Sequence, residues 1–482
     1  MPAVNVVLPA EPIRSLDAYR ASGGGEALDA ASRLGPDGVI EELEASGLRG
    51  RGGAGFPTGR KWRSIASAPG THRYVACNAA EGEPATFKDR EILRRNPYQV
   101  IEGLAVAAAA VGAREAYIGI KASFERERAA LTTAAREMAD NGLLGGIASV
   151  TIVEGPEEYL FGEETGLLEV IEGGDPLPRL FPPYVHGLFS TSPQMGWSAS
   201  RQQAGHEHGH ESNPTLVNNV ETLANVTHIL ANGAGWFRQF GTPQSPGTVV
   251  VTVVGDVTTP LVVEVPMGTP LSDVLDLAGG PTKGRRFKAA LSGVANPFLP
   301  SEFFDANLTY EAMDALGTGL GAAGFAVYDD SACMVALAAL VSRFLYVESC
   351  NQCPPCKFGS GELTEYLARI EAGEGTEGDL ELMHARLKTV TDGNRCYLPV
   401  QEQRVVSSLL QTFPEEVAAH LDGRGCPLPR RLVLPKIVDL DGGEVVYDEQ
   451  QQRKRPDWTY ADEPILTAPL PHPRSPGAEP PG

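Results

Sequence analysis

The sequence predicts a multidomain protein of mixed α/β and α+β class, and three features of the chain support this prediction. Its 482 residues exceed the size of a single hydrophobic core, which rarely grows beyond about 250–300 residues. Strand-like runs alternate with helical stretches in the first half of the chain, which is typical of an α/β domain with a largely parallel sheet. A β-rich region follows, and helical periodicity then dominates as far as Leu421.

The N-terminal half contains a helical segment, residues 1–46, and the predicted α/β domain, residues 47–243. Periodicity is lost over residues 174–215, and such a long irregular segment is normally functional or disordered. Within it we expect an insertion at about 189–212. The predicted strands cover 73–77, 117–121 and 149–154, and the predicted helices cover 101–111, 124–139, 163–171 and 218–232.

The C-terminal half divides into three parts. Residues 244–329 hold strands at 248–254, 261–265 and 288–292 and a helix at 271–277, and they resemble a small β-grasp domain of the soluble-ligand-binding type, which we expect to act as a spacer. Residues 330–426 hold helical segments at 332–347, 361–370, 380–390 and 401–421, whose apolar stripes can meet in a four-helix bundle. Residues 427–482 hold a hairpin at 432–446, turning at 441–443, and a proline-rich tail that we expect to be disordered.

Composition excludes two classes of partner. The formal charge of −21, from 40 basic and 61 acidic residues, argues against nucleic acid, because phosphate binding needs a basic face. No run approaches the roughly 18 apolar residues of a membrane helix, and the first ten residues lack a secretory signal pattern. We therefore expect a cytoplasmic protein without direct membrane insertion, which reaches a membrane only through partners.

Four of the seven cysteines form one pattern. Cys350, Cys353 and Cys356 are spaced Cys-x2-Cys-x2-Cys, and Cys396 follows 396 − 356 = 40 residues later. A triplet with one distant cysteine favours a [4Fe–4S] cluster, whereas structural zinc, the alternative, usually pairs two Cys-x2-Cys units. The other three, Cys77, Cys333 and Cys426, are expected to be buried or incidental thiols.

A glycine-rich loop covers residues 47–62, where six of sixteen positions are glycine. Such a loop lets backbone N–H groups approach a phosphate or a planar ring, and Arg49, Arg51 and Lys61 supply positive charge. It matches neither a Walker loop nor a dinucleotide-binding fingerprint. The alternative is a flexible surface loop.

Two acidic stretches also stand out. Residues 78–84 leave a predicted strand end, where open α/β sheets place ligands, and residues 159–165 open a predicted helix. Carboxylates at such places can accept hydrogen bonds from ribose hydroxyls or a carboxamide. The alternative is ordinary acidity at a helix start, which stabilises the helix dipole.

Together these pieces resemble the NADH-oxidising flavoprotein family of respiratory complex I, which includes diaphorase subunits of NAD-dependent hydrogenases and formate dehydrogenases. The resemblance spans roughly residues 40–425. The matching segments are 47–62, 78–90, 159–165, 178–179, 218–223 and the four-cysteine set.

The resemblance implies a Rossmann-like FMN-binding domain, a β-grasp domain and a cluster-bearing helical bundle. It implies hydride transfer from NADH to FMN, then single-electron transfer to the [4Fe–4S] cluster. Phe56 would stack on the nicotinamide nucleotide, and Glu83 and Glu164 would accept hydrogen bonds from it. A small thioredoxin-like [2Fe–2S] subunit or a ferredoxin, within a larger redox complex, would be the partner. The residues expected around FMN are Gly50, Arg51, Gly52, Gly53, Lys61, Asn78, Glu81, Tyr159, Gly162, Glu163, Asn218, Asn219 and Thr222.

The chain also departs from the family pattern. Ala80 replaces a common aspartate, Ser64 an aromatic that often stacks on adenine, Phe181 a lysine, and Tyr184 a phenylalanine. Two alternatives therefore remain: a flavin and iron–sulfur relay reduced by a ferredoxin or another donor, and a degenerate structural subunit. The histidine tract at 206–210 could bind a divalent metal, although a solvated insertion is the better interpretation.

Overall fold

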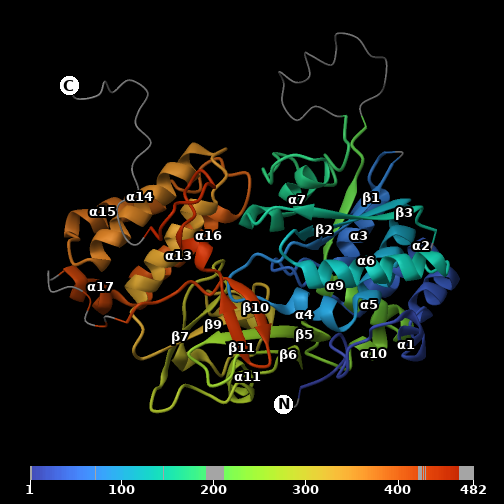
Figure 1. Ribbon diagram of the computed structural model, residues 1–482, viewed down its shortest axis with the longest axis horizontal. Coiled ribbons are helices and arrows are strands. Elements are labelled where there is room, and N and C mark those ends of the chain that lie inside the picture. Colours follow the sequence, from blue (N-terminus) through green and yellow to red (C-terminus); the bar gives the residue numbers. More distant parts are fainter. Residues whose placement is uncertain are drawn as a thin grey trace, which may run out of the picture. The chain divides into compact units, whose positions relative to one another are not determined.

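The computed structural model describes residues 3–70, 72–144, 146–191, 211–421, 426, 428 and 430–465. It confirms the mixed α/β multidomain class and divides into two compact units (Figure 1). Unit 1 comprises Met1–Asp330 and Pro435–Asp448, and unit 2 comprises Ser331–Leu434 and Glu449–Gly482. The histidine tract at 206–210, most of the expected insertion and the tail from residue 466 lie outside the described residues.

The first sheet of unit 1 has four parallel strands in the order β3-β2-β1-β4. Their bounds are β1 Tyr74–Ala79, β2 Glu115–Lys121, β3 Ser149–Gly155 and β4 Thr215–Asn219. The strands expected at 73–77, 117–121 and 149–154 are confirmed. Strand β4 was not expected: it covers the end of the segment predicted to be irregular and the start of the helix expected at 218–232. Its buried Thr215, Leu216 and Val217 pair with β1, which makes this short segment extended.

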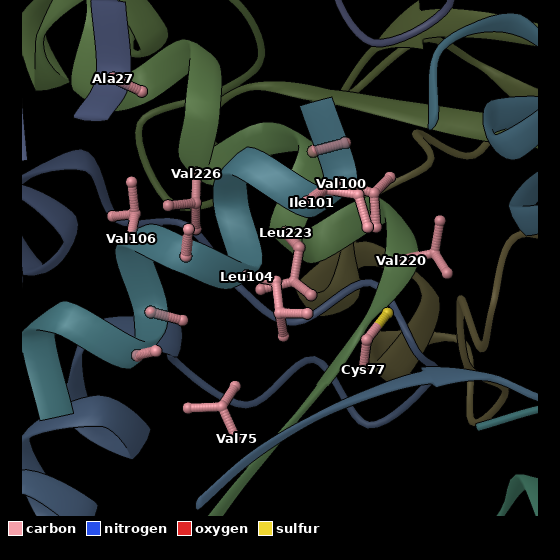
Figure 2. Close-up of a cluster of buried hydrophobic side chains, with 14 of the residues drawn as sticks. Ala27, Val75, Cys77, Val100, Ile101, Leu104, Val106, Val220, Leu223 and Val226 are labelled. Atoms are coloured by element: carbon pink, nitrogen blue, oxygen red, sulfur yellow. The ribbon is translucent and has the colours of Figure 1, made fainter. Parts of the chain in front are cut away.

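Helices surround this sheet (Figure 1). Glycine at 103 lets α5 and α9 pack closely, because a Cβ there would lie 2.1 Å from the carbonyl oxygen of Leu223. Figure 2 shows Val75 and Cys77 of β1 among apolar side chains of α5 and α9. The helices are α1 Leu16–Ala21, α2 Glu26–Ser46, α3 Thr58–Ser67, α4 Lys88–Arg95, α5 Pro97–Val111, α6 Glu125–Asp140, α7 Glu164–Ile171, α9 Val220–Asn232 and α10 Ala234–Phe237, with a 3₁₀ turn η1 at Tyr159–Gly162.

The second sheet of unit 1 is mixed, with the order β6-β5-β9-β7-β8. The strands and the helix expected at 248–254, 261–265, 288–292 and 271–277 are confirmed. The central strand β9 was missed, although it is parallel to β5 and antiparallel to β7. The bounds are β5 Thr248–Gly255, β6 Leu261–Pro266, β7 Phe287–Ser292, β8 Leu299–Pro300, β9 Gly324–Asp329, α11 Leu271–Leu277, η2 Ser301–Phe303 and α12 Tyr310–Ala315.

The expected hairpin is confirmed as β10 Ile437–Asp441 and β11 Glu444–Tyr447. Gly442 and Gly443 form its turn with φ of 57° and 85°, as a two-residue hairpin loop requires. The hairpin belongs to unit 1, where the Arg90 guanidinium donates to the Ile437 carbonyl oxygen at 2.9 Å.

Unit 2 is helical. Residues 401–421 are not one helix as expected, because Pro414 has no N–H to continue the ladder and a new helix begins there. The segment after the hairpin returns to this unit, where the Lys454 ammonium pairs with the Glu348 carboxylate at 2.9 Å, both fully buried. The helices are α13 Met334–Glu348, α14 Pro354–Glu371, α15 Glu377–Leu387, α16 Leu398–Thr412 and α17 Pro414–Leu421, with η3 at Glu449–Gln452. Among the helices described in the whole chain, none has both the length and the apolar character that crossing a membrane demands.

Candidate functional site

The carboxyl edge of the parallel sheet gathers most of the expected site residues. The chain reverses its direction of strand addition between β1 and β4, which makes this edge a topological switch point. Asn78 and Asn219 are register partners at the ends of these two strands, and Cys77 is paired with Asn218. Open α/β sheets bind ligands at such a point.

The glycine-rich loop lies against the start of helix α9 at this edge. The hydrogen bond from the Gly50 N–H to the Phe56 carbonyl oxygen, 2.8 Å, closes the central part of the loop. The Arg51 N–H donates to the Thr222 hydroxyl at 2.9 Å. A Cβ on Gly52 would lie 3.1 Å from the Cβ of Asn219. The loop is therefore a fixed part of the site, and position 52 has little room for a side chain.

The side chain of Arg51 points into the interior of unit 1. It is 2% exposed, and its guanidinium donates to the carbonyl oxygens of Thr248 and Arg49, each at 2.9 Å. Glu221 faces it at 3.9 Å. The guanidinium is thus committed to holding the loop, and the backbone of Arg51 is the part that lies along the edge.

Strand β1 and the turn η1 are joined by direct hydrogen bonds. The Asn78 amide donates to the Gly162 carbonyl oxygen at 2.7 Å. Beyond the strand, the Tyr159 hydroxyl donates to the Glu83 carboxylate, which also accepts from the Val294 N–H at 2.7 Å. Burial raises the pKa of Glu83 although these hydrogen bonds oppose the shift. A carboxylate has about four acceptor positions, so Glu83 can still accept from a ligand.

A buried charge network under the edge was not predicted as part of the site. The Lys88 ammonium, 1% exposed, contacts the carboxylates of Asp89 at 2.7 Å and Glu221 at 2.9 Å. The Asn219 side chain bridges them, accepting from Lys88 at 3.0 Å and donating to Asp89 at 2.7 Å. The two carboxylates raise the pKa of Lys88 against the opposing effect of its burial. The three consecutive charged residues at 88–90 were the hint to this network in the sequence, because charged residues are almost never buried unless they are paired.

Glu81 serves the same edge through helix α4. Its carboxylate accepts from the Asp89 N–H at 3.0 Å and from the Arg90 guanidinium at 2.9 Å. These contacts cap the helix start and fix the segment that follows β1. In the structure, the direct role of Glu81 is to position this segment.

Glu163 and Glu164 have different contacts. Glu163 caps helix α7, accepting from the N–H groups of Thr165 at 2.9 Å and Gly166 at 2.8 Å, and burial raises its pKa. Glu164 pairs with the Lys61 ammonium at 2.7 Å, and both side chains are partly exposed. Glu163 therefore acts as an ordinary acidic group at a helix start, which was the alternative interpretation of this stretch. Glu164 remains reachable by a ligand.

Two side chains of the loop region face solvent. Phe56 is 50% exposed, which is unusual for a large aromatic ring. Ser64 is exposed on helix α3, whereas Trp62 on the same helix is buried and donates to the Asn218 amide oxygen at 2.7 Å. An exposed ring beside a ligand-binding edge is available for stacking.

These residues fit a planar, phosphate-bearing cofactor such as FMN. Gly50, Gly52 and Gly53 offer a surface without Cβ atoms. Asn219 caps helix α9, whose first N–H groups lie at the carboxyl end of β4 and favour an anion. The structure thus brings together the expected residues from the loop, β1, η1, α7 and α9.

The four cysteines lie in unit 2, three of them at the starts of two helices, while Cys350 lies two residues after α13 ends. Cys353 is the residue before α14, Cys356 lies in its first turn, and Cys396 lies two residues before α16 begins. Cys356 is buried, whereas Cys350, Cys353 and Cys396 are partly exposed. Burial, with smaller contributions from Cys350, Cys353 and Glu402, raises the pKa of Cys356 to about 11.

The separation of these thiols fits a cluster better than one zinc ion. Sulfur ligands of a tetrahedral zinc lie about 3.8 Å apart, given Zn–S bonds of about 2.3 Å. Among the described residues, no three of the four sulfur atoms lie within 4.8 Å of one another. In a cubane cluster the thiolates bind four different irons and are more widely spaced.

Comparisons with known proteins match both parts of the chain. Residues 43–228 match the family model of the Nuo51 FMN-binding domain, residues 250–292 the SLBB domain, and residues 336–420 the NADH-ubiquinone oxidoreductase-F iron–sulfur binding region. The NADH-quinone oxidoreductase F 2 subunit of Rhizobium meliloti (strain 1021) is 41% identical over 86% of this chain and 96% of that protein.

Two further comparisons give the same result. The NADP-reducing hydrogenase subunit HndC of Solidesulfovibrio fructosivorans is 34% identical over 86% of this chain and 82% of its own length. Among solved structures, the NAD⁺-reducing [NiFe]-hydrogenase in the H₂-reduced state superposes with a TM-score of 0.71 at 31% identity, covering 85% of this chain and 67% of that one.

Proposed function

The chain belongs to the family of NADH-quinone oxidoreductase F subunits, and from this premise we propose how its own residues serve electron transfer from NADH through FMN to a [4Fe–4S] cluster. It is an oxidoreductase subunit with an FMN-binding domain and an iron–sulfur binding region. FMN, when bound, takes up two electrons from NADH as a hydride and releases them one at a time, which suits a cluster that accepts one. The comparisons do not favour the relay without a nucleotide.

One observation carries the assignment of the flavin residues: three contacts join the loop region, β1, η1, α7 and α9 in pairs at the switch point. The loop is held to α9 through Thr222, β1 to η1 through Asn78, and Lys61 to Glu164. We propose that this edge binds FMN. The residues proposed to surround it are Gly50, Arg51 (through its backbone), Gly52, Gly53, Lys61, Asn78, Glu81, Tyr159, Gly162, Glu163, Asn218, Asn219 and Thr222.

We propose that the nucleotide lies against the exposed ring of Phe56, with Glu83 and Glu164 as its hydrogen-bond acceptors. Glu83 is held in place by Tyr159 and Val294, so it can orient a ligand without reorganising. Glu164 would exchange its contact with Lys61 for a ligand group. Both acidic groups then position the nicotinamide and leave the redox chemistry to the cofactors.

We also propose the domain boundaries and the cluster ligands. Residues 47–243 form a Rossmann-like FMN domain, 244–329 a β-grasp spacer, and 330–426 a four-helix bundle, built by α13 to α16, with α17 appended. The helical segment 1–46 and the tail 427–482 complete the chain. Cys350, Cys353, Cys356 and Cys396 are the proposed cluster ligands.

The partners follow from the relatives, which are named as subunits of NADH-quinone oxidoreductases and hydrogenases. We propose that this chain works in a larger redox complex beside a small thioredoxin-like [2Fe–2S] subunit or a ferredoxin. We also propose that the chain is cytoplasmic and reaches the membrane surface only through its partners.

Anaerobic stopped-flow reduction of the flavin by NADH tests the function. Wild type should be reduced, and E83Q and E164Q should keep full flavin while kcat/KM falls on the order of tenfold to a hundredfold, since each charged hydrogen bond contributes roughly 1.5–3 kcal/mol. E115Q is the matched control, because Glu115 is exposed at the opposite end of β2. Reduction of wild type by a ferredoxin but not by millimolar NADH or NADPH would overturn the proposal in favour of the relay.

A further inference from the structure

A second group of metal-binding side chains lies in unit 2, apart from the four cysteines of the iron–sulfur motif. Within the described part of the chain, Cys333, His420 and Cys426 are the only three such residues whose ligand atoms all lie within 4.8 Å of one another. We call them the thiol–imidazole cluster. Cys333 and His420 are buried, and Cys426 is partly exposed. Their spacing along the chain offers no reason to group them, and Cys333 and Cys426 were expected to be buried or incidental thiols.

The histidine is oriented as a metal ligand would be. Its Nδ1 lies 2.7 Å from the carbonyl oxygen of Glu416, an acceptor, so Nδ1 carries the proton. Nε2 therefore has a free lone pair, and it lies 3.5 Å from the sulfur of Cys333. Histidines that bind metals usually donate their other ring N–H to a backbone carbonyl or carboxylate in this way.

The distances suit one small ion. Bond lengths of about 2.3 Å to sulfur and 2.05 Å to nitrogen place tetrahedral zinc ligands about 3.6 Å apart, close to the observed 3.5 Å between Cys333 and His420. The Cys426 sulfur lies within 4.8 Å of the ligand atoms of both, and its thiol donates to the carbonyl oxygen of Leu428 at 3.1 Å. The three residues come from separate parts of the unit: the residue before α13, the end of α17 and the segment beyond it.

We propose that Cys333, His420 and Cys426 bind one Zn²⁺ ion, with water as the fourth ligand on the partly exposed side of Cys426. Two thiolates and one neutral imidazole suit a borderline-soft divalent ion, and they balance its charge. Binding releases two thiol protons to solvent and changes no oxidation state. The ion links the start of α13 to the end of α17, which closes the helical unit that carries the iron–sulfur motif. The matched iron–sulfur region, residues 336–420, includes His420 but neither cysteine.

Metal analysis of the full-length chain, purified anaerobically with zinc in the medium, tests the proposal. Wild type should contain about one zinc per chain beside its iron and acid-labile sulfide. C426S and H420Q should each lower the zinc content at least fivefold while keeping iron and sulfide. C396S should do the opposite, losing iron and keeping zinc. C77A, at a buried cysteine outside both groups, should keep both metals.

Zinc X-ray absorption of wild type should show two sulfur ligands and two nitrogen or oxygen ligands, the latter being the imidazole and water. The proposal is overturned if wild type lacks zinc after exposure to one equivalent of Zn²⁺, or if C396S rather than C426S removes it. Mass spectrometry without reductant that finds a Cys333–Cys426 disulfide would also overturn it. If C426S fails to fold, C333S and the wild-type absorption spectrum decide the question.

Discussion

The sheet edge in unit 1 and the cysteine site in unit 2 prepare for their cofactors in different ways. At the edge, the polar groups already hold one another: Glu81 holds Arg90, Glu163 caps α7, and Asn219 bridges Lys88 and Asp89. In unit 2, three of the four thiols, those of Cys350, Cys353 and Cys396, are partly exposed. The polar groups of the edge are thus fixed by contacts within the protein, whereas a bound cluster would itself link the four thiols.

This difference predicts opposite responses to substitution. The sheet edge should stay folded without its cofactor. It should lose cofactor binding only where a substitution blocks the approach of the cofactor to the backbone. A ligand set should fail when any one member is lost, because the metal supplies the folding free energy at such a site. Four substitutions test this contrast, starting with the largest expected effect.

Cys396→Ser should abolish the [4Fe–4S] cluster or convert it to a smaller one, because a hydroxyl is a poorer ligand for iron than a thiolate. Iron, acid-labile sulfide and the electron paramagnetic resonance spectrum of the reduced protein measure the loss. Flavin content should stay at the wild-type level, since FMN is assigned to the other unit. A mutant that keeps four irons per chain would show that Cys396 is not the fourth ligand.

Gly52→Val should reduce flavin retention more than tenfold. A Cβ at this position already lies 3.1 Å from the Cβ of Asn219, and the valine methyl groups would occupy the surface that a flavin must approach. Flavin released by denaturation, relative to protein, is the measurement. Gly235→Val is the control, because nothing lies within 4 Å of a Cβ there. Full occupancy in Gly52→Val would refute the loop assignment.

The same contrast explains how much could be predicted from the sequence. Strands β1, β2 and β3 are local runs of apolar residues, and they were predicted correctly. The four cysteines were also recognised from their spacing along the chain, and their role as cluster ligands stays a prediction. Strand β4 could not be predicted from local sequence, because it ends in Asn218 and Asn219, which are poor strand formers. Only its pairing with β1, about 140 residues earlier, makes it extended.

Side-chain roles at the edge were harder to predict for the same physical reason. Arg51 was expected to offer charge to a phosphate, but Thr248, nearly 200 residues away, takes its guanidinium. Lys88 pairs with Glu221, which lies 221 − 88 = 133 residues later. The grouping of Cys333 with His420 likewise joins residues 87 apart. Periodicity and spacing carry no information about contacts at such separations.

Glu402 provides a pH test of unit 2. Its carboxyl group is buried, accepts from the Ser342 hydroxyl at 2.5 Å, and has a second oxygen without a partner among the described residues. Burial raises its pKa to about 8. The folded chain therefore holds this proton more tightly than the unfolded chain, so the stability gained below the ordinary carboxyl pKa is lost as the pH rises towards 8.

Glu402→Gln should remove this dependence, since a glutamine is neutral at every pH. Circular dichroism at pH 5 to 9 measures the Tm of both proteins. The Tm of wild type should fall steadily relative to that of Glu402→Gln as the pH rises. A shift of one pKa unit corresponds to about 1.4 kcal/mol, so the change should amount to a few kcal/mol at most. Cys356 is the titratable neighbour, and its thiol should be held constant by keeping the cluster bound. A constant difference across this range would show that Glu402 is ionised when folded.

Ser64→Phe should have the smallest of the four effects, and it should strengthen nucleotide binding at the sheet edge. Ser64 is exposed on α3, so a ring there has room and can provide the stacking face that the family usually carries. Base–aromatic stacking contributes about 1–3 kcal/mol, and at an exposed position the lower value applies, so KM for NADH should fall about fivefold with kcat unchanged. Ser64→Leu separates stacking from apolar contact, because it adds apolar area without a ring. Equal gains in both variants would assign the effect to apolar contact, and no gain in either would show that adenine does not bind beside α3.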